Sequence, residues 1–304
     1  MPPWKNTGVD TADLEILRNM LKHRVRSGVL LGAALLAALI FLPPAGAMIL
    51  LALCCGWSLW EFYALLKAGG IPHFRGIGLV GGISLIVATW WAYHQAPGAR
   101  LYGDVEAIVL FAVAAAVFIR QMFVPALDHA LKSMAATLLG VVYVAWLFNF
   151  LNKLLLVFGL EEGRWLIFYL ALVVKSTDVG AYFVGCRFGG RKFFPTISPA
   201  KTWSGVIGGL ATGVAFSMAA LYFLQPVLSH LDFGWVDALV LGFILSAAGI
   251  AGDLIESLLK RASGVKDSGT LIQGMGGILD VVDSLIFAAP FLYIYMRLFV
   301  DIIG

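Results

Sequence analysis

Two acidic side chains stand three residues apart in the otherwise apolar segment 249–257. A helix here would place the carboxylates of Asp253 and Glu256 on one face, because residues three apart are neighbours on a helix surface. Acidic groups within lipid-facing segments are costly, and they usually mark a functional site. The segment therefore predicts a site that uses negative charge.

The stretch that follows, 257–283, places basic residues, acidic residues and five glycines between two apolar segments. Its basic residues could bind phosphates, and its acidic residues could bind a hard cation such as Mg²⁺, which commonly links protein carboxylates to substrate phosphates. Its glycines, including Gly276 and Gly277, would let the backbone approach a ligand closely. The charged residues are Lys260, Arg261, Lys266, Asp267, Asp280 and Asp283. This pattern predicts a metal–nucleotide or metal–pyrophosphate site, although acidic residues also line ion pathways.

The loop 189–205 contains a second pattern that favours phosphate. Ser198 is a candidate N-cap and Pro199 a candidate first helical residue, so the sequence predicts a helix start at this point. Lys201 and Thr202 would then lie beside the free N–H groups of a helix N-terminus, where anions bind. The alternative, a basic loop that serves only membrane topology, does not explain the Ser-Pro-x-Lys-Thr order.

A third cluster lies at the end of the apolar segment 165–185. Asp178 and Tyr182 are four residues apart, so a helix would present both on one face. The alternative is that Asp178 pairs with Lys175, three residues earlier, and neutralises it. Both interpretations stay open at this point.

The composition identifies the class of protein that must position these residues. The chain has 304 residues, of which 61% are hydrophobic and only 13% charged, and its mean hydropathy is +0.91. This is too apolar for a soluble domain. We therefore expect an all-α, polytopic integral membrane protein. Apolar runs of suitable length predict about nine spans, at residues 28–43, 45–66, 77–95, 105–122, 134–158, 165–185, 204–225, 236–258 and 279–299.

The basic residues indicate an orientation. If the N-terminus is cytoplasmic, about sixteen of the 21 Lys and Arg residues face the cytoplasm. The loops 186–203 and 259–278 then share the cytoplasmic side, in a cell membrane. The net charge of +3 suits anionic lipid headgroups, and no nucleic-acid-binding motif is present.

The chain divides into three predicted regions. Residues 1–26 form a cytoplasmic segment with apolar residues at helical spacing among basic ones, which is typical of a helix on an anionic membrane surface. A basic tail that serves only topology would look similar. Residues 27–160 hold the N-terminal transmembrane helices, and residues 161–304 hold the catalytic region.

The polar motifs, in order, resemble those of the phosphatidate cytidylyltransferase family, the CDP-diacylglycerol synthases. The resemblance covers about residues 175–283. It is carried by Thr177-Asp178-x-Gly180-x-Tyr182, Ser198-Pro199-x-Lys201-Thr202, Gly252-Asp253-x2-Glu256-Ser257 and Lys260-Arg261-x4-Lys266-Asp267-x12-Asp280-x2-Asp283.

The resemblance implies transfer of CMP from CTP to phosphatidic acid, giving CDP-diacylglycerol and pyrophosphate with Mg²⁺ as cofactor. It assigns the metal to Asp253 and Asp280, with Asp178, Glu256 and Asp283 as further candidates, and allows a second, monovalent cation such as K⁺ at Asp178. Lys201 and Lys266 join the metal aspartates as catalytic residues. Substrate binding falls to Ser198, Thr202, Lys260, Arg261, Asp267, Gly276 and Gly277. Membrane lipids are further expected partners, and so is a second copy of the chain through the glycines of 205–213, although packing within one chain is an equal alternative.

Three positions depart from the family pattern. Met275 stands where the pattern has histidine, Val281 where it has arginine after the metal aspartate, and Ser204 where it commonly has glutamate. The alternatives are therefore transfer to another lipid phosphate or alcohol, an inactive homologue, or an ion or solute transporter.

Overall fold

The computed structural model describes residues 32, 34–95, 101–125, 127–228, 231–265 and 277–300. Within them, eight helical stretches are long and apolar enough to cross a membrane. They are α2 (Pro44–Ala68), α3 (Arg75–Gln95), α4 (Leu101–Met122), the stretch Leu127–Val157, α7 (Leu160–Phe188), α8 (Trp203–Leu224), α9 (Trp235–Ala262) and α10 (Ile278–Phe299). The stretch Leu127–Val157 comprises η1 (Leu127–His129), α5 (Ala130–Gly140), η2 (Val141–Trp146) and α6 (Leu147–Val157).

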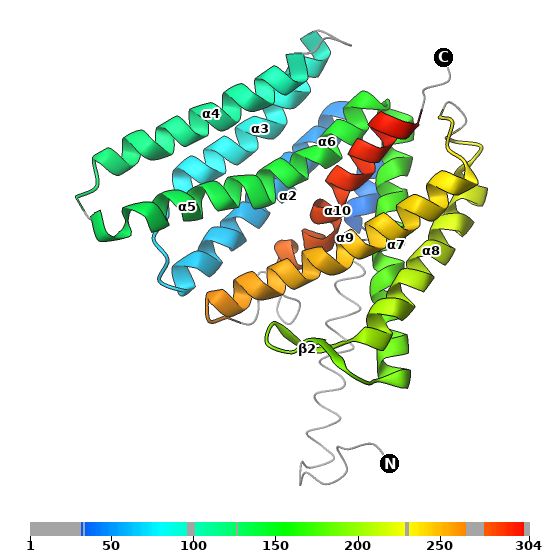
Figure 1. Cartoon of the computed structure of the whole chain (residues 1–304). Helices are drawn as coiled ribbons and strands as arrows, with labels where there is room; N and C mark the ends of the chain where they lie inside the picture. Colours follow the sequence, from blue (N-terminus) through cyan, green and yellow to red (C-terminus); the bar gives the residue numbers. More distant parts are fainter. Residues whose placement is uncertain are drawn as a thin grey trace.

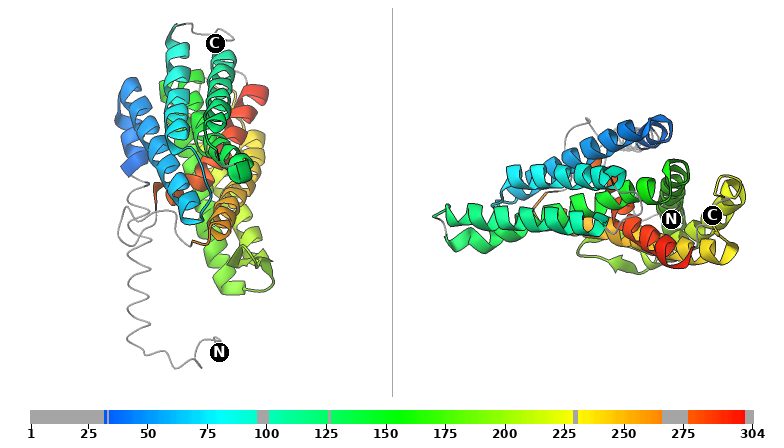
Figure 2. Two further views of the ribbon diagram at one scale, coloured as in Figure 1. Left: turned by 90° about the vertical axis from the view of Figure 1, so that its left-hand side faces the viewer. Right: turned by 90° about the horizontal axis from the view of Figure 1, so that it is seen from above.

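This architecture confirms the all-α, polytopic membrane fold. Eight of the predicted spans coincide with these helical stretches. The remaining one, 28–43, is described at residues 32 and 34–43, of which 34–41 are helical, and it is not among the stretches long enough to cross a membrane. The segment 1–26 lies outside the described residues. Helices α3 and α4 lie on one side of the bundle and α8 on the other (Figures 1 and 2).

The predicted helix start at Ser198 and Pro199 is wrong. The segment Ser198–Thr202 is a strand, β2, paired antiparallel with β1 (Lys192–Phe194). Helix α8 begins at Trp203, and Thr202 is its N-cap, because the Thr202 hydroxyl accepts a hydrogen bond from the Gly205 N–H at 3.2 Å. Ser198 and Thr202 are both good capping residues, and strand pairing keeps the chain extended until the second of them.

The glycines of 205–213 allow α8 to pack closely inside one chain. A Cβ at Gly209 would lie 2.9 Å from the Thr177 carbonyl oxygen of α7, and a Cβ at Gly213 would overlap the hydroxyls of Thr177 and Ser246. The Thr177 hydroxyl donates a 2.7 Å hydrogen bond to Ser246 of α9. These glycines therefore join α7, α8 and α9 within one chain, as the alternative interpretation allowed.

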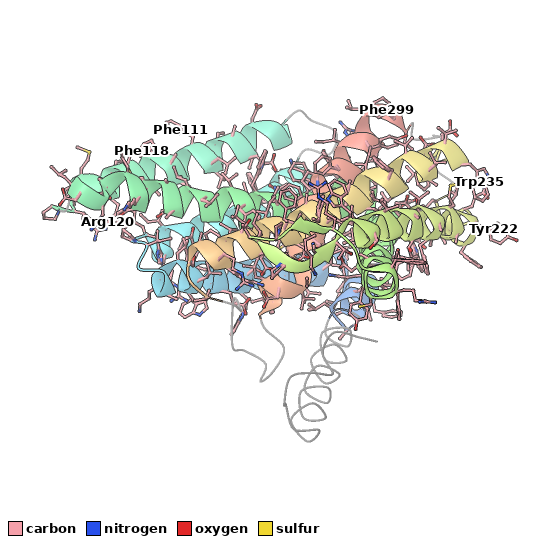
Figure 3. All side chains as sticks on the ribbon, turned by 60° about the horizontal axis from the view of Figure 1, so that its bottom comes forward. Phe111, Phe118, Arg120, Tyr222, Trp235 and Phe299 are labelled. Carbon is pink, nitrogen blue, oxygen red and sulfur yellow. The ribbon has the colours of Figure 1, made fainter. Side chains whose placement is uncertain are left out.

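The outer surface of the bundle suits a lipid environment. Large aromatic side chains on α4, α8, α9 and α10 point away from the bundle, among them Phe111, Tyr222, Trp235 and Phe299 (Figure 3). Phe111 is 75% exposed and Trp235 is 51% exposed, which in water would leave broad apolar patches.

The N-terminal half holds the start of α10 through one buried carboxylate. Glu61 of α2 is 3% exposed. It accepts hydrogen bonds from the backbone N–H groups of Ile278 at 3.1 Å and Leu279 at 2.8 Å, which have no partner within their own helix. The Trp57 indole N–H donates to the same carboxylate at 2.9 Å. A Cβ at Gly277 would overlap Glu61, so this contact requires glycine.

Replacing Gly213 by alanine tests the helix packing. The change should lower the free energy of unfolding by about 1–3 kcal/mol, because a methyl group must displace two buried hydroxyls. Thermal unfolding in detergent measures it against Gly76→Ala, a helical position with open space around its Cβ. Equal midpoints for the two variants would contradict the packing described.

Glu61→Gln tests the anchor of α10. A glutamine keeps only one oxygen, so one of the two N–H groups would face an amide donor, and stability should fall by about 1–3 kcal/mol. The matched control is Glu161→Gln, an exposed acid in the first turn of α7, where we expect about 0.5 kcal/mol. Chemical or thermal unfolding of both variants in the same detergent gives the comparison, and equal losses would argue against the anchor.

Candidate functional site

The polar residues of the C-terminal half gather at one end of the bundle. The hairpin β1–β2, the C-terminal ends of α7 and α9, and the first turns of α8 and α10 meet there (Figure 1). Helix α9 packs against α8, α7 and α10, so it is the element that brings the others together. Segments far apart in sequence therefore converge on one site.

Three carboxylates form the centre of the site. One oxygen from each of Asp253, Glu256 and Asp283 lies within 4.8 Å of the other two. Asp253 and Glu256 come from one face of α9, as their spacing predicts, and Asp283 comes from the facing side of α10. Glu256 is 2% and Asp283 3% exposed, whereas the Asp253 side chain is 37% exposed. The cluster thus has a buried floor and one accessible edge.

Two lysines partly neutralise these acids. Lys201, delivered by strand β2, forms an ion pair with Asp253. Lys260 lies between Glu256, at 3.0 Å, and Asp280, at 2.5 Å. Asp280 also accepts a 2.7 Å hydrogen bond from the Gly277 N–H. Asp280 is therefore held at the edge of the cluster by Lys260 and by the start of its own helix.

The donor set fits a divalent cation with oxygen ligands. When all are ionised, the four acids and two lysines carry a net charge of −2. Among the described residues, Glu256 Oε1 is buried with no hydrogen-bond donor. The other oxygen of this carboxylate pairs with Lys260, but a buried carboxylate oxygen without a donor is still unfavourable. Oxygen-only ligands, close spacing and uncompensated charge are the features that Mg²⁺ or a similar ion would satisfy.

A buried tyrosine from the N-terminal half also faces this charge. Tyr143 lies in η2, a π-helical segment, and is 6% exposed. Its hydroxyl has no hydrogen-bond partner in the described part of the chain, and the nearby negative charges are those of Asp283, Glu256 and Asp253. π-Helical turns are frequent at functional sites. Tyr143 therefore offers the site an unused hydroxyl.

The other predicted phosphate-binding residues with described positions lie on the hairpin or against it. Ser198 and Thr202 are the ends of β2, and Thr202 is occupied as the α8 cap. The Arg261 guanidinium is exposed and donates to the Ile197 carbonyl oxygen at 3.5 Å, so it lies under the hairpin turn. Lys201 also donates to the Ile250 carbonyl oxygen at 3.5 Å. Lys201 thus lies at the accessible edge of the acidic cluster, and Arg261 lies against the hairpin turn.

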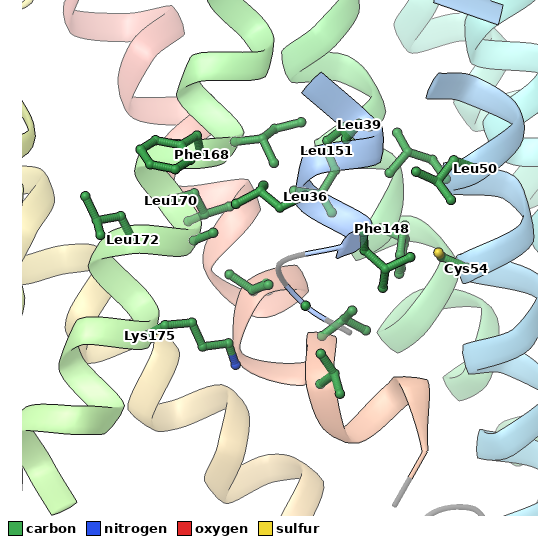
Figure 4. Close-up of a pocket in the computed structure, with 18 of the residues that line it drawn as sticks. Leu36, Leu39, Leu50, Cys54, Phe148, Leu151, Phe168, Leu170, Leu172 and Lys175 are labelled. Atoms are coloured by element: carbon green, nitrogen blue, oxygen red, sulfur yellow. The ribbon is translucent and has the colours of Figure 1, made fainter. Parts of the chain in front are cut away.

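Asp178 forms the ion pair that the sequence allowed. Lys175 Nζ lies 3.7 Å from Asp178 Oδ2, and both side chains are about two-fifths exposed, at 44% and 40%. Together with Asp280 they line a cavity of about 670 Å³ (Figure 4). Tyr182, predicted on the same helix face, is 68% exposed. The structure therefore supports the pairing of Asp178 with Lys175.

Some predicted site residues lie outside the described residues. They are Lys266, Asp267 and Gly276, together with Met275. Gly277 is described, and it precedes the first turn of α10.

Glu61 and Tyr143 were missed by the sequence analysis. Glu61 carried a usable signal, because an acidic residue within an apolar span is rare and usually functional. Tyr143 carried none, since an aromatic residue among apolar ones reads as ordinary core and the π-helical turn has no pattern in the sequence.

Comparisons with known proteins agree with this geometry. The chain matches the Cytidylyltransferase family over residues 22–299. It is 32% identical over 283 residues to the phosphatidate cytidylyltransferase of Bacillus subtilis, covering 92% of this chain and 98% of that protein. It is also 32% identical over 295 residues to that of Haemophilus influenzae, covering 92% of this chain and all of that protein. A shorter match, 46% identical over 135 residues, covers 44% of this chain and 48% of the phosphatidate cytidylyltransferase of Brucella suis. The chain belongs to the cytidylyltransferase family.

Proposed function

We propose that this protein transfers CMP from CTP to phosphatidic acid, giving CDP-diacylglycerol and pyrophosphate. The observation that carries the proposal is the acidic cluster of Asp253, Glu256 and Asp283, which pairs with two lysines and lies next to an apolar cavity lined in part by Asp280. Such a site can join a nucleotide–metal complex to a lipid. The relatives named as phosphatidate cytidylyltransferases support the same activity.

We further propose that the acidic cluster binds Mg²⁺. Asp253, Glu256 and Asp283 would hold it. Asp280 lies beside them and forms an ion pair with Lys260. When bound, Mg²⁺ would neutralise the triphosphate and the charge that develops on the leaving pyrophosphate. Asp178 is the candidate for a second, monovalent ion such as K⁺, although its carboxylate pairs with Lys175 here.

The chain's own residues then position the nucleotide. Lys201 and Lys260 each touch an acid of the cluster, so they can bind phosphate oxygens without leaving the site. Arg261 on the hairpin side, with Ser198 and Thr202, would extend this basic rim. Lys266, Asp267, Gly276 and Gly277 complete the proposed substrate contacts.

The reaction follows from this arrangement as an in-line displacement. A phosphate oxygen of phosphatidic acid attacks the α-phosphorus of CTP, and the bond from that phosphorus to the oxygen bridging to the β-phosphate breaks. Pyrophosphate leaves with the electron pair. Phosphatidate is already anionic at neutral pH, so positioning and charge neutralisation carry the step without a strong general base or a covalent enzyme intermediate.

The membrane placement completes the proposal. The protein would lie in the cell membrane with its N-terminus and the site facing the cytoplasm, where CTP is dissolved. The lipid would enter sideways between helices and keep its tails in the bilayer. The proposed division into segments 1–26, 27–160 and 161–304 assigns most site residues to the last, and homodimerisation stays a proposal.

Pyrophosphate release tests the proposed activity. Purified protein in detergent with CTP, phosphatidic acid and Mg²⁺ should release pyrophosphate only when the lipid is present. Asp253→Asn should lower the rate by about 10²-fold or more, because it removes a charge that the phosphates and the metal both need. Asp232→Asn, an exposed acid between α8 and α9, is the control and should keep the parent rate.

Other results would redirect the proposal. Equal rates for the Asp253 and Asp232 variants would remove the acidic cluster from the chemistry. Release with a lipid alcohol or another lipid phosphate, but not with phosphatidic acid, would show a different acceptor. Metal- or proton-dependent flux in proteoliposomes without pyrophosphate release would indicate a transporter.

A further inference from the structure

The cavity beside the site is almost wholly apolar and has one charged end. Its volume of about 670 Å³ lies within the range of about 300–1,000 Å³ that holds small ligands. Leucines and phenylalanines from residues 35–39 and from α2, α6, α7 and α10 form about half of its wall, and most of the rest is also apolar (Figure 4). The charged residues lining it are Lys175, Asp178 and Asp280. A molecule with a long apolar part and one polar, charged end fits this shape, and its charged end would meet both Lys175 and the two aspartates.

Lys175 is the one cation among the described residues that line the cavity. It stands near the middle of α7, and its side chain extends toward α10 (Figure 4). The distance of 3.7 Å to Asp178 is longer than a hydrogen bond, so the ammonium N–H groups stay available to a ligand. A lysine at this depth in a span is costly, and pairing alone repays little of that cost.

Val281 contributes no positive charge to the cavity. It follows Asp280 and lines the same cavity, at the position where the resembled family pattern has arginine. The residue next to Asp280 therefore presents an apolar side chain to the cavity. Positive charge at this end of the cavity comes from α7 instead.

We propose that Lys175 binds the phosphate of the lipid acceptor while the acyl chains lie along the apolar wall. The inference rests on the proposed function and assigns its acceptor specificity to one residue. Lys175 holds the acceptor phosphate beside Asp280, and so beside the acidic cluster. It selects a lipid phosphate over a lipid alcohol of the same chain length, because only the phosphate offers an anion to the ammonium.

Binding of the acceptor alone tests the inference without turnover. The probe is phosphatidic acid in detergent, without CTP or Mg²⁺, compared with diacylglycerol of the same chains, and the readout is the ligand-dependent rise in unfolding temperature. Lys175→Met should weaken phosphatidic acid binding at least tenfold and leave diacylglycerol binding unchanged. Lys175→Arg should retain most of the binding. The control is Lys67→Met, at the exposed end of α2 and away from the cavity lining.

A relocated charge gives a second arm. Val281→Arg in the Lys175→Met background should restore phosphatidic acid binding, because it returns a cation to the same end of the cavity. In the pyrophosphate assay, Lys175→Met should raise KM for phosphatidic acid at least tenfold and leave KM for CTP unchanged. Lys175→Gln, which can still hydrogen-bond to Asp178, replaces the methionine variant if that variant does not fold.

The outcomes separate this inference from the proposed function. Two outcomes would overturn the role of Lys175 and make it a counter-ion of Asp178. One is equal weakening of phosphatidic acid and diacylglycerol binding in Lys175→Met, and the other is unchanged phosphatidic acid binding in Lys175→Met or in its replacement, Lys175→Gln. Lysine-dependent binding without any pyrophosphate release would uphold the lipid-phosphate site and sink the proposed reaction. Lipid-dependent pyrophosphate release, together with phosphatidic acid binding that does not depend on Lys175, would support the proposed reaction and contradict the lipid-phosphate site.

Discussion

The repulsion among the acids of α9 and α10 is the constraint on which the rest of the site depends. Three carboxylates with oxygens within 4.8 Å of one another, two of them on nearly buried side chains, cannot stay ionised in an apolar bundle without compensation. Lys201 and Lys260 supply part of it from opposite directions, one from the hairpin and one from α9 itself. The remaining negative charge favours a cation at the cluster, as in the proposed Mg²⁺ site, and a cation held by such acids would attract phosphates.

Holding like charges together requires helices that cannot move apart, and the packing around α9 provides this. Glycines on α8 let three helices approach until the Thr177 and Ser246 hydroxyls bond to each other. Glu61 fixes the first turn of α10, so a residue of the N-terminal half helps to place Asp280 and Asp283. The N-terminal helices therefore contribute to the position of the acids as well as to the membrane fold.

Sequence reasoning succeeded where local periodicity decides the outcome. Hydropathy predicted the spans because each crossing needs its own apolar run, and helical spacing placed Asp253 beside Glu256. It did not predict which acid of α10 joins them: Asp283 does, whereas Asp280 turns to Lys260, and this depends on how α10 packs on α9. The helix start was predicted too early because the pairing of 198–202 with 192–194 depends on a contact between two segments and not on the local residues. Tyr143 gave no signal because its position near the acids depends on a π-helical turn and on helix packing.

The position of Lys175 links the nucleotide chemistry to the membrane. Soluble CTP can bring its phosphates to the cations on the hairpin. An acceptor with two acyl chains must instead approach from the lipid side, where exposed charge is disfavoured. Lys175 meets this requirement within a mostly apolar cavity, because its pairing distance of 3.7 Å to Asp178 leaves ammonium N–H groups available to an anionic head. Under this proposal the apolar wall binds acyl chains of any lipid, whereas Lys175 favours a lipid with a phosphate. The bound phosphate would lie beside Asp280, next to the acidic cluster.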